Sequence, residues 1–410
     1  MVSVLRERMA GSGIDALILC DPDSIYYFTG CKIAPGERMF VLLVTKDKLK
    51  LVLPEMFTDE SKTAAAGVER IFFKDTDNYI IAVTKALRDC KTIGVDKYLV
   101  AKFLLPYMRE LSDANFVDGS AVVDFMRMHK NPEECEKMRI SSLLNDKIIG
   151  DFAKFLALPS SIGISEKDGA KKLLEIAEAN GAECISFEPI VSFGDGTAQL
   201  HHEPASDVFL KPNCPIILDI GFVKEGYCSD MTRSFFRTED GMVIADYGVL
   251  RADSDSVSCT SITNAENSGG SSSLPEMTDT KNFGIAMSAE EKKKYDKFHE
   301  IYNIVKRANL AGIAKVAPGV SLAEVDAAAR DLITKEGYGE YFTHRLGHGI
   351  GIAVHEFPDV SAASNAICAE GMIFSIEPGI YHMESGIGVR IEDLVLVTKD
   401  GCEVLNKYLK

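Results

Sequence analysis

The segment HRLGHGIGIAVHEFP, residues 344–358, places three histidines among three glycines. Near neutral pH a histidine can bind a metal ion or transfer a proton. Three glycines in five residues penalise a helix heavily, so we expect extended backbone here. In an extended strand His344 and His348 lie on the same face, whereas His355 has the opposite parity and needs a bend to join them. Glycine also lets the backbone approach a crowded site closely.

Two aspartates in the run CPIILDIGFVKEGYCSDMTRSFF indicate a cation site. The run predicts a β-hairpin with a Lys-Glu-Gly turn. If the hairpin folds about Lys224 and Glu225, Asp219 and Asp230 lie directly opposite each other, with Cβ atoms roughly 4.5 to 5.5 Å apart. Both aspartates lie in apolar sequence, and burying two unpaired carboxylates costs free energy. A bound cation would remove that conflict.

Two glutamates repeat this pattern in the run GMIFSIEPGIYHMESGIGVRIEDLVLVT. A hairpin centred between residues 384 and 385 sets Glu377 opposite Glu392. A slip of one residue would break either pairing, so the agreement of two independent hairpins matters. The alternative is that each acid caps a turn or pairs with a base, for which Arg233 and Arg390 are available.

Four carboxylates that converge with one imidazole from the histidine segment suit a pair of divalent first-row metal ions. Mn, Co, Fe and Zn all accept mixed oxygen and nitrogen ligands, and we favour Mn. The sequence therefore predicts two divalent metal ions per chain as the cofactor.

The elements that must position these residues divide into two domains. Residues 1–128 contain strand-like runs and an amphipathic helix, which predicts a smaller N-terminal α/β domain. A long helix then begins at Asn131, the predicted N-cap, and Glu134 lies where it completes a capping box. We expect residues 129–410 to form the second, larger domain.

A polar segment interrupts the second domain at about residues 240–285. Its centre, residues 254–280, is rich in Ser, Thr, Asn and Gly. This composition predicts a surface loop or linker, with a lid over a site as the alternative.

Composition limits the partners of the chain. A formal net charge of −16 argues against nucleic acid or an anionic membrane surface as the main partner. No apolar run approaches the length of a transmembrane helix, and the first residues do not resemble a signal peptide. The ten cysteines are scattered without a CxxC pair, unlike a disulfide framework or a zinc ribbon. We therefore expect a cytoplasmic protein.

The motifs LDIG…GYCSDMTRSF, HRLGHGIGIAVHEFP, FSIEPGIY and VRIEDLVLVT resemble those of the pita-bread metallopeptidases. That family includes aminopeptidase P, prolidase, methionine aminopeptidase and creatinase. The resemblance implies an α+β fold, with a pita-bread catalytic domain preceded by a creatinase-type N-terminal domain. GIDALILCDPDSIYYFTG resembles that N-terminal domain, which methionine aminopeptidases usually lack. The proline-directed branch is therefore the better match.

The resemblance implies a metal-binding role for five residues. Asp219 would bind one metal ion. Asp230 and Glu392 would bridge two ions. His348 and Glu377 would complete the coordination of the second.

The resemblance also implies residues that act on the substrate. His201, in DGTAQLHHEP, matches a substrate-facing catalytic histidine, and we interpret His202 beside it as incidental. His344 and His355 match two further histidines of the pocket. Arg390 either binds substrate or holds a carboxylate ligand in place.

The implied activity is hydrolysis of Xaa-Pro bonds in small peptides, as an aminopeptidase or a dipeptidase. Two metal ions roughly 3.5 to 4 Å apart can share a water and lower its pKa, and the hydroxide would attack the scissile carbonyl. His355 would stabilise the oxyanion, and Glu377 would carry a proton to the leaving nitrogen. We also expect a homodimer.

Two other functions are compatible with the same fold. One is a creatinase-like hydrolase that cleaves a small non-peptide C–N bond without metal ions. The other is a non-catalytic binding protein. Members of both classes commonly lose metal ligands that this chain retains.

Overall fold

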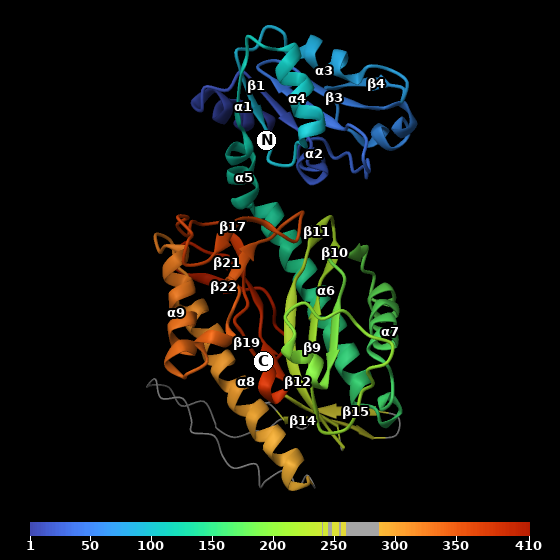
Figure 1. The fold of residues 1–410 in the computed structure, drawn as a ribbon, viewed down its shortest axis with the longest axis vertical. Coiled ribbons are helices and arrows are strands. Elements are labelled where there is room, and N and C mark those ends of the chain that lie inside the picture. Colours follow the sequence, from blue (N-terminus) through green and yellow to red (C-terminus); the bar gives the residue numbers. More distant parts are fainter. Residues whose placement is uncertain (240, 245–247, 254–255, 260–286) are drawn as a thin grey trace. The chain divides into compact units, whose positions relative to one another are not determined.

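The computed structural model describes residues 1–239, 241–244, 248–253, 256–259 and 287–410 (Figure 1). The chain divides into two compact units, Met1–Arg127 and Met128–Lys410. Each unit combines helices with sheets, as the predicted α+β class requires.

A mixed sheet of six strands forms the centre of the first unit, and helices cover both of its faces. The strands are β1 (Ala16–Leu19), β2 (Val41–Thr45), β3 (Leu49–Pro54), β4 (Val68–Phe73), β5 (Thr92–Val95) and β6 (Asn115–Asp118), and the helices are α1 (Val2–Gly11), α2 (Pro22–Thr29), α3 (Tyr79–Leu87), α4 (Ala101–Glu110) and α5 (Ser120–Met128). The strand order is β4-β3-β2-β1-β5-β6, with β1 antiparallel to β2 and parallel to β5. All four residues of β1 are buried, because a sheet covered on both faces leaves no side for polar residues.

Four long helices frame the second unit. They are α6 (Pro132–Ala157), α7 (Glu166–Ala179), α8 (Ala289–Lys315) and α9 (Leu322–Lys335). The predicted capping box of α6 is confirmed: the Asn131 side chain accepts the Glu134 N–H at 3.0 Å, and the Glu134 carboxylate accepts the Asn131 N–H at 2.8 Å. The first four backbone N–H groups of a helix have no partner within the helix. This capping box supplies such partners at Asn131 and Glu134, so it fixes where α6 begins.

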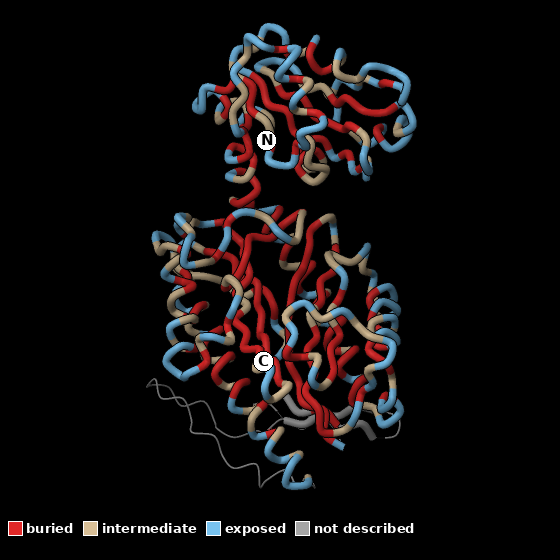
Figure 2. The backbone as a smooth tube through the Cα atoms, in the orientation of Figure 1, coloured by how far each residue is buried: buried red, intermediate tan, exposed pale blue. Residues whose placement is uncertain are grey.

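Several short sheets lie between these helices. Their strands are β7 (Cys184–Ile185), β8 (Ile190–Phe193), β9 (Cys214–Ile220), β10 (Phe222–Lys224), β11 (Tyr227–Cys228), β12 (Met231–Thr238), β16 (Gly347–Gly349), β17 (Glu356–Val360), β18 (Ile373–Ile376), β19 (Gly379–His382), β20 (Ile387–Arg390), β21 (Asp393–Val397) and β22 (Cys402–Val404). Helices α6 and α7 pack on the sheet that contains β8, β9 and β12, and α8 and α9 pack on the sheet that contains β18 and β21. Figure 2 shows the buried backbone concentrated in these central strands.

The described parts of the polar segment 240–285 lengthen one sheet. Strands β13 (Gly241–Ile244), β14 (Gly248–Asp253) and β15 (Ser256–Cys259) follow β12 as successive antiparallel neighbours. Residues 260–286 lie outside the described part of the chain. The loop interpretation of residues 254–280 is wrong for residues 256–259, which pair with β14 as strand β15. The loop and lid interpretations of residues 260–280 stay predictions.

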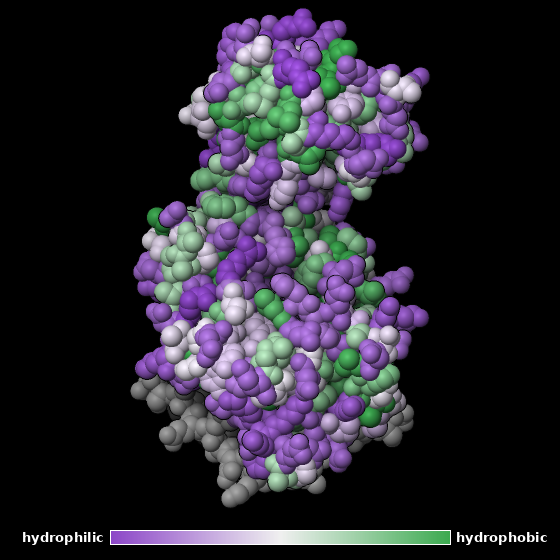
Figure 3. Space-filling model, viewed as in Figure 1, coloured by the Kyte–Doolittle hydropathy of each residue, from purple (hydrophilic) through white to green (hydrophobic). Residues whose placement is uncertain are grey.

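Within the described residues, every helix is too short or too polar to cross a lipid bilayer. The face of the molecule in Figure 3 is mostly hydrophilic, with small apolar areas between.

Candidate metal centre

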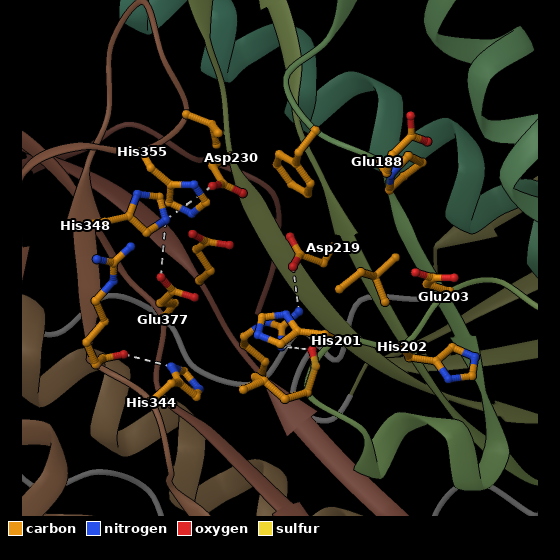
Figure 4. Close-up of a pocket in the computed structure, with 18 of the residues that line it drawn as sticks. Glu188, His201, His202, Glu203, Asp219, Asp230, His344, His348, His355 and Glu377 are labelled. Atoms are coloured by element: carbon orange, nitrogen blue, oxygen red, sulfur yellow. Dashed lines mark hydrogen bonds and ion pairs between the residues drawn. The ribbon is translucent and has the colours of Figure 1, made fainter. Parts of the chain in front are cut away.

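One pocket of about 480 Å³ in the second unit collects every residue predicted for the site (Figure 4). These residues are His201, Asp219, Asp230, His344, His348, His355, Glu377, Arg390 and Glu392. They come from strands or loops that are far apart in sequence. The sheet that contains β9 and β12 and the sheet that contains β16 and β18 both contribute to the pocket.

The first hairpin turns one residue later than predicted, so the predicted pairing of its strands is wrong by two positions. The ladder between β9 and β12 places Asp219 opposite Thr232, rather than opposite Asp230. The turn is at Glu225 and Gly226, which both have positive φ, as a two-residue hairpin turn of this kind requires. The resulting offset of two positions leaves Asp230 on the same face as Asp219, so both still reach the pocket.

The predicted register of the second hairpin is confirmed. Gly379 pairs with Arg390 on one side of the two glutamates, and Ile376 pairs with Asp393 on the other. Glu377 and Glu392 occupy the opposed positions that continue this register between the two ladders. Their side chains line the pocket together.

His348 directs one ring nitrogen at the acidic groups. Its Nδ1 faces the Gly349 carbonyl oxygen at 3.1 Å, so the ring donates from Nδ1 and keeps a lone pair on Nε2. Nε2 lies 3.6 Å from Asp230 Oδ2 and 3.4 Å from Glu377 Oε1. One ligand atom each from Asp230, His348 and Glu392 lie within 4.8 Å of one another. This arrangement suits a shared cation.

The glycines of the histidine segment allow three strands to meet. A β-carbon on Gly347 would overlap the Ser375 carbonyl oxygen, and one on Gly349 would lie 2.5 Å from the Phe357 carbonyl oxygen. Strand β16 therefore fits between β17 and β18 only without side chains at these positions. This close packing fixes the backbone of β16 and therefore the position of His348 in the pocket.

Burial and mutual repulsion disfavour charge on the carboxylates. Burial, followed by the charges of Glu392 and Asp219, raises the pKa of Asp230 well above its usual range. Burial raises the pKa of Glu377 to about 7 and that of Glu392 well above its usual value. Burial also lowers the pKa of His348 to about 3. A neutral imidazole beside crowded acids is the protonation state that a divalent cation needs.

Within the described part of the chain, two buried carboxylate oxygens have no hydrogen-bond partner. Asp219 Oδ1 and Glu392 Oε1 are buried and unpaired. A buried unpaired carboxylate oxygen is costly, and a metal ion bound there would satisfy both. The residues present therefore fit a metal centre.

Arg390 is engaged with the protein on every side of its guanidinium. It donates to Asp219 Oδ2 at 2.5 Å, to Thr232 Oγ1 at 3.0 Å and to Tyr381 Oη at 2.6 Å. These contacts favour the role of holding a carboxylate over substrate contact. Arg233, the other base considered, pairs with Asp393 at 2.8 Å instead.

The pocket histidines differ in their surroundings. His344 Nδ1 faces the Arg345 carbonyl oxygen at 2.7 Å, its Nε2 faces Tyr381 Oη at 3.2 Å, and burial lowers its pKa to about 3. The His355 ring meets the His348 ring edge to face, with centroids 4.4 Å apart. His355 was expected to reach the same face as His348 only if the backbone bends between them. The β16–β17 register shifts after His348, which supplies this irregularity. Both His201 and His202 line the pocket, but the His201 ring points toward Asp219 and the His202 ring points the other way (Figure 4).

Sequence reasoning missed three polar residues that support the ligands: Thr232, Ser375 and Tyr381. Thr232 Oγ1 donates to Glu392 Oε2 at 2.9 Å, and Ser375 Oγ donates to Glu377 Oε1 at 3.1 Å. Strand alternation could have found two of them, because Ser375 and Tyr381 share the parity of Glu377.

Comparison with known proteins identifies the family of both domains. The profile of Metallopeptidase family M24 matches residues 136–252 and 277–399, and that of the Creatinase/Prolidase N-terminal domain matches residues 1–129. An uncharacterised peptidase of Staphylococcus aureus is 32% identical over 100% of this chain and 99% of its own length.

Two solved structures share the whole architecture. The prolidase from Pyrococcus horikoshii matches with a TM-score of 0.77 and 27% identity, over 100% of this chain and 98% of that one. The Xaa-Pro dipeptidase from Bacillus anthracis matches with a TM-score of 0.76 and 27% identity, over 100% and 97% of the two chains. The predicted two-domain pita-bread fold is confirmed, and the chain belongs to metallopeptidase family M24, whose metallopeptidases use divalent metal ions.

Proposed function

We propose that this chain is a dinuclear-metal peptidase that hydrolyses Xaa-Pro bonds in small peptides. The observation that carries the proposal is the convergence of four carboxylates and the free Nε2 of His348 on one pocket. The likeness to proteins named prolidase and Xaa-Pro dipeptidase supports the choice of bond.

In this proposal five side chains hold two divalent metal ions. Asp219 would help to hold one ion, Asp230 and Glu392 would contribute to both, and His348 and Glu377 would complete the second. When bound, the ions supply a Lewis acid for the scissile carbonyl and lower the pKa of the attacking water. The unpaired oxygens of Asp219 and Glu392 support this assignment, because each lacks another partner.

The chain's own residues orient the substrate and move the proton. Ser375 donates its hydroxyl hydrogen to Glu377, which orients that carboxylate to carry a proton to the leaving nitrogen. His355 and His201 line the pocket, where an N–H from either ring would stabilise the developing oxyanion. His344 stays neutral and aligns the substrate.

The wall of the pocket suits a proline ring. Apolar side chains of Phe187, Pro189, Ile190, Leu200 and Val354 line it. The nitrogen of a Xaa-Pro bond carries no N–H, so apolar contact rather than a hydrogen bond has to select the ring.

The proposal includes three further expectations from the sequence. These are Mn as the preferred metal, a homodimer as the assembly and the cytoplasm as the location. Metal titration of activity and sedimentation analysis of the purified protein test the first two.

The proposed activity is tested by incubating the protein, supplied with Mn(II), with a Xaa-Pro dipeptide, a Xaa-Pro-Yaa tripeptide and a Xaa-Ala dipeptide. Cleavage of the first alone indicates a dipeptidase, and cleavage of the first two indicates an aminopeptidase. Metal analysis should find two equivalents per chain. Metal-loaded protein that leaves both proline peptides intact would contradict the proposal.

A further inference from the structure

We propose that Glu166 and His202 are positioning residues that hold His201 in the pocket, an inference that rests on the catalytic role proposed for His201. The sequence gives no sign of this arrangement, and His202 was interpreted there as incidental. The two neighbouring histidines point to opposite sides of their segment (Figure 4).

Glu166 is a fully buried carboxylate at the first residue of α7. Its Oε2 lies 2.7 Å from His202 Nε2 and accepts the Ala205 N–H at 2.9 Å, and its Oε1 accepts the Phe193 N–H at 2.7 Å. One carboxylate thus holds the chain at points before and after His201. A buried carboxylate is tolerated where such donors surround it.

The His202 ring fits closely in its site. A β-carbon on Gly196 would lie 2.9 Å from His202 Cε1, so the ring packs against bare backbone. The side chain is 9% exposed. Its Nδ1 lies 3.4 Å from Gln199 Oε1, on the segment that leads into His201.

The two ends of the segment are fixed independently of His202. Upstream, Thr197 Oγ1 accepts the Gly388 N–H at 3.0 Å. Downstream, the Ala205 carbonyl oxygen accepts the Lys167 N–H at 3.1 Å. Between these ends, His202 attaches the segment to Glu166, and the Leu200 carbonyl oxygen lies 3.5 Å from Arg390 Nη1. The shorter contact of His202 directly follows residue 201, so we infer that it holds the orientation of His201.

Two readouts test the proposal with the variants His202→Ala and Glu166→Gln of the full chain. Hydrogen exchange followed by mass spectrometry should show faster exchange in residues 199–205, while the metal content stays that of the wild type. The value of kcat/KM on a Xaa-Pro dipeptide should fall by roughly tenfold or more, because small misplacements of a catalytic group are that costly. Asp207→Asn, which alters an exposed carboxylate just beyond the segment, is the matched control and should change neither readout.

A double-mutant cycle separates positioning from general stability. If His202 acts through His201, adding His202→Ala to His201→Ala should change kcat/KM by less than about twofold. Losses that multiply, or unchanged exchange in residues 199–205, would overturn the proposal. An inactive wild-type protein would overturn the proposed function, and the exchange experiment would still decide whether His202 anchors the segment.

Discussion

A single hydroxyl joins the two acidic pairs of the pocket. Thr232 Oγ1 donates to Glu392 and accepts from Arg390 Nε, while the same arginine donates to Asp219. The orientation of two proposed metal ligands therefore depends on one buried threonine. Partners of this kind commonly change metal affinity by about 10- to 100-fold when they are removed.

We expect Thr232→Val to weaken metal binding by about 10- to 100-fold, because Glu392 loses its donor and Arg390 loses an acceptor. Unfolding free energy should also fall by about 1–3 kcal/mol. Thr238→Val is the matched control: it is a buried threonine on the same strand whose hydroxyl donates to the Gly241 carbonyl oxygen, away from the pocket. Titration of both variants with Mn(II) should show weaker binding only in the first. Equal affinities would contradict the role given to Thr232.

The raised pKa of Glu377 makes the stability of metal-free protein depend on pH. Between the ordinary glutamate pKa of 4.5 and about 7, the folded state retains a proton that the unfolded chain releases. Unfolding free energy should therefore fall as pH rises through this window, by roughly 3 kcal/mol for this group. Denaturant titrations at pH 5 and pH 7.5 measure the slope, and Glu377→Gln should reduce it by the share of this group, while the raised pKa values of Asp230 and Glu392 keep their own contribution. Adding Mn(II) at pH 7.5 should recover the loss, since metal replaces the proton.

At the scale of elements, the packing of β16 decides whether the ligands meet. Gly347 lies against the Ser375 backbone, and the Ser375 hydroxyl both accepts the His348 N–H at 3.0 Å and donates to Glu377. Any displacement of this contact moves two proposed ligands at once.

Gly347→Ala should destabilise the second unit by on the order of 3 kcal/mol, because the added carbon has to push two strands apart. Metal content should fall with it. Gly401→Ala adds a carbon where no atom lies within 4 Å, so it should behave like the wild type. Thermal unfolding and metal analysis of the two variants give the comparison. A fully metallated Gly347→Ala protein would show that the strand contact is unimportant.

Much of the fold and the pocket could be predicted from the sequence, but the register of the first hairpin could not. The capping box of α6 and the second hairpin followed from local patterns that leave one solution. In the first hairpin the turn depends on Glu225 adopting positive φ, which a glutamate rarely does. Backbone N–H groups of Glu225 and Gly226 donate to the Glu183 side chain, which supports this conformation from a distant part of the chain. No local sequence pattern predicts this contact between the turn and Glu183.

At the scale of the whole molecule, each unit has its own hydrophobic cores. Among the residues that the structure describes, two such cores lie in Met1–Arg127 and two in Met128–Lys410. Every proposed metal ligand belongs to the second unit. Metal binding should therefore stabilise one unit and leave the other unchanged.

We expect calorimetry to resolve two unfolding transitions, of which only one moves upward when Mn(II) replaces a chelator. Ligand at about 100 times its dissociation constant stabilises a folded unit by roughly 2.7 kcal/mol, enough to separate the transitions. Limited proteolysis before heating assigns each transition to its fragment. A common shift of both transitions would show that the units unfold together.

The wide separation of Asp219 and Glu392 along the chain has a consequence for how the protein is made. A ribosome delivers the first aspartates long before it delivers the last glutamate, so the emerging polypeptide lacks part of the proposed ligand set until residue 392 has been made. Binding of the proposed metal ions by the full ligand set would therefore follow the synthesis of Glu392. A product that stops short of Glu392 would lack one of the proposed ligands. Metal uptake would thus report that translation had run past that residue.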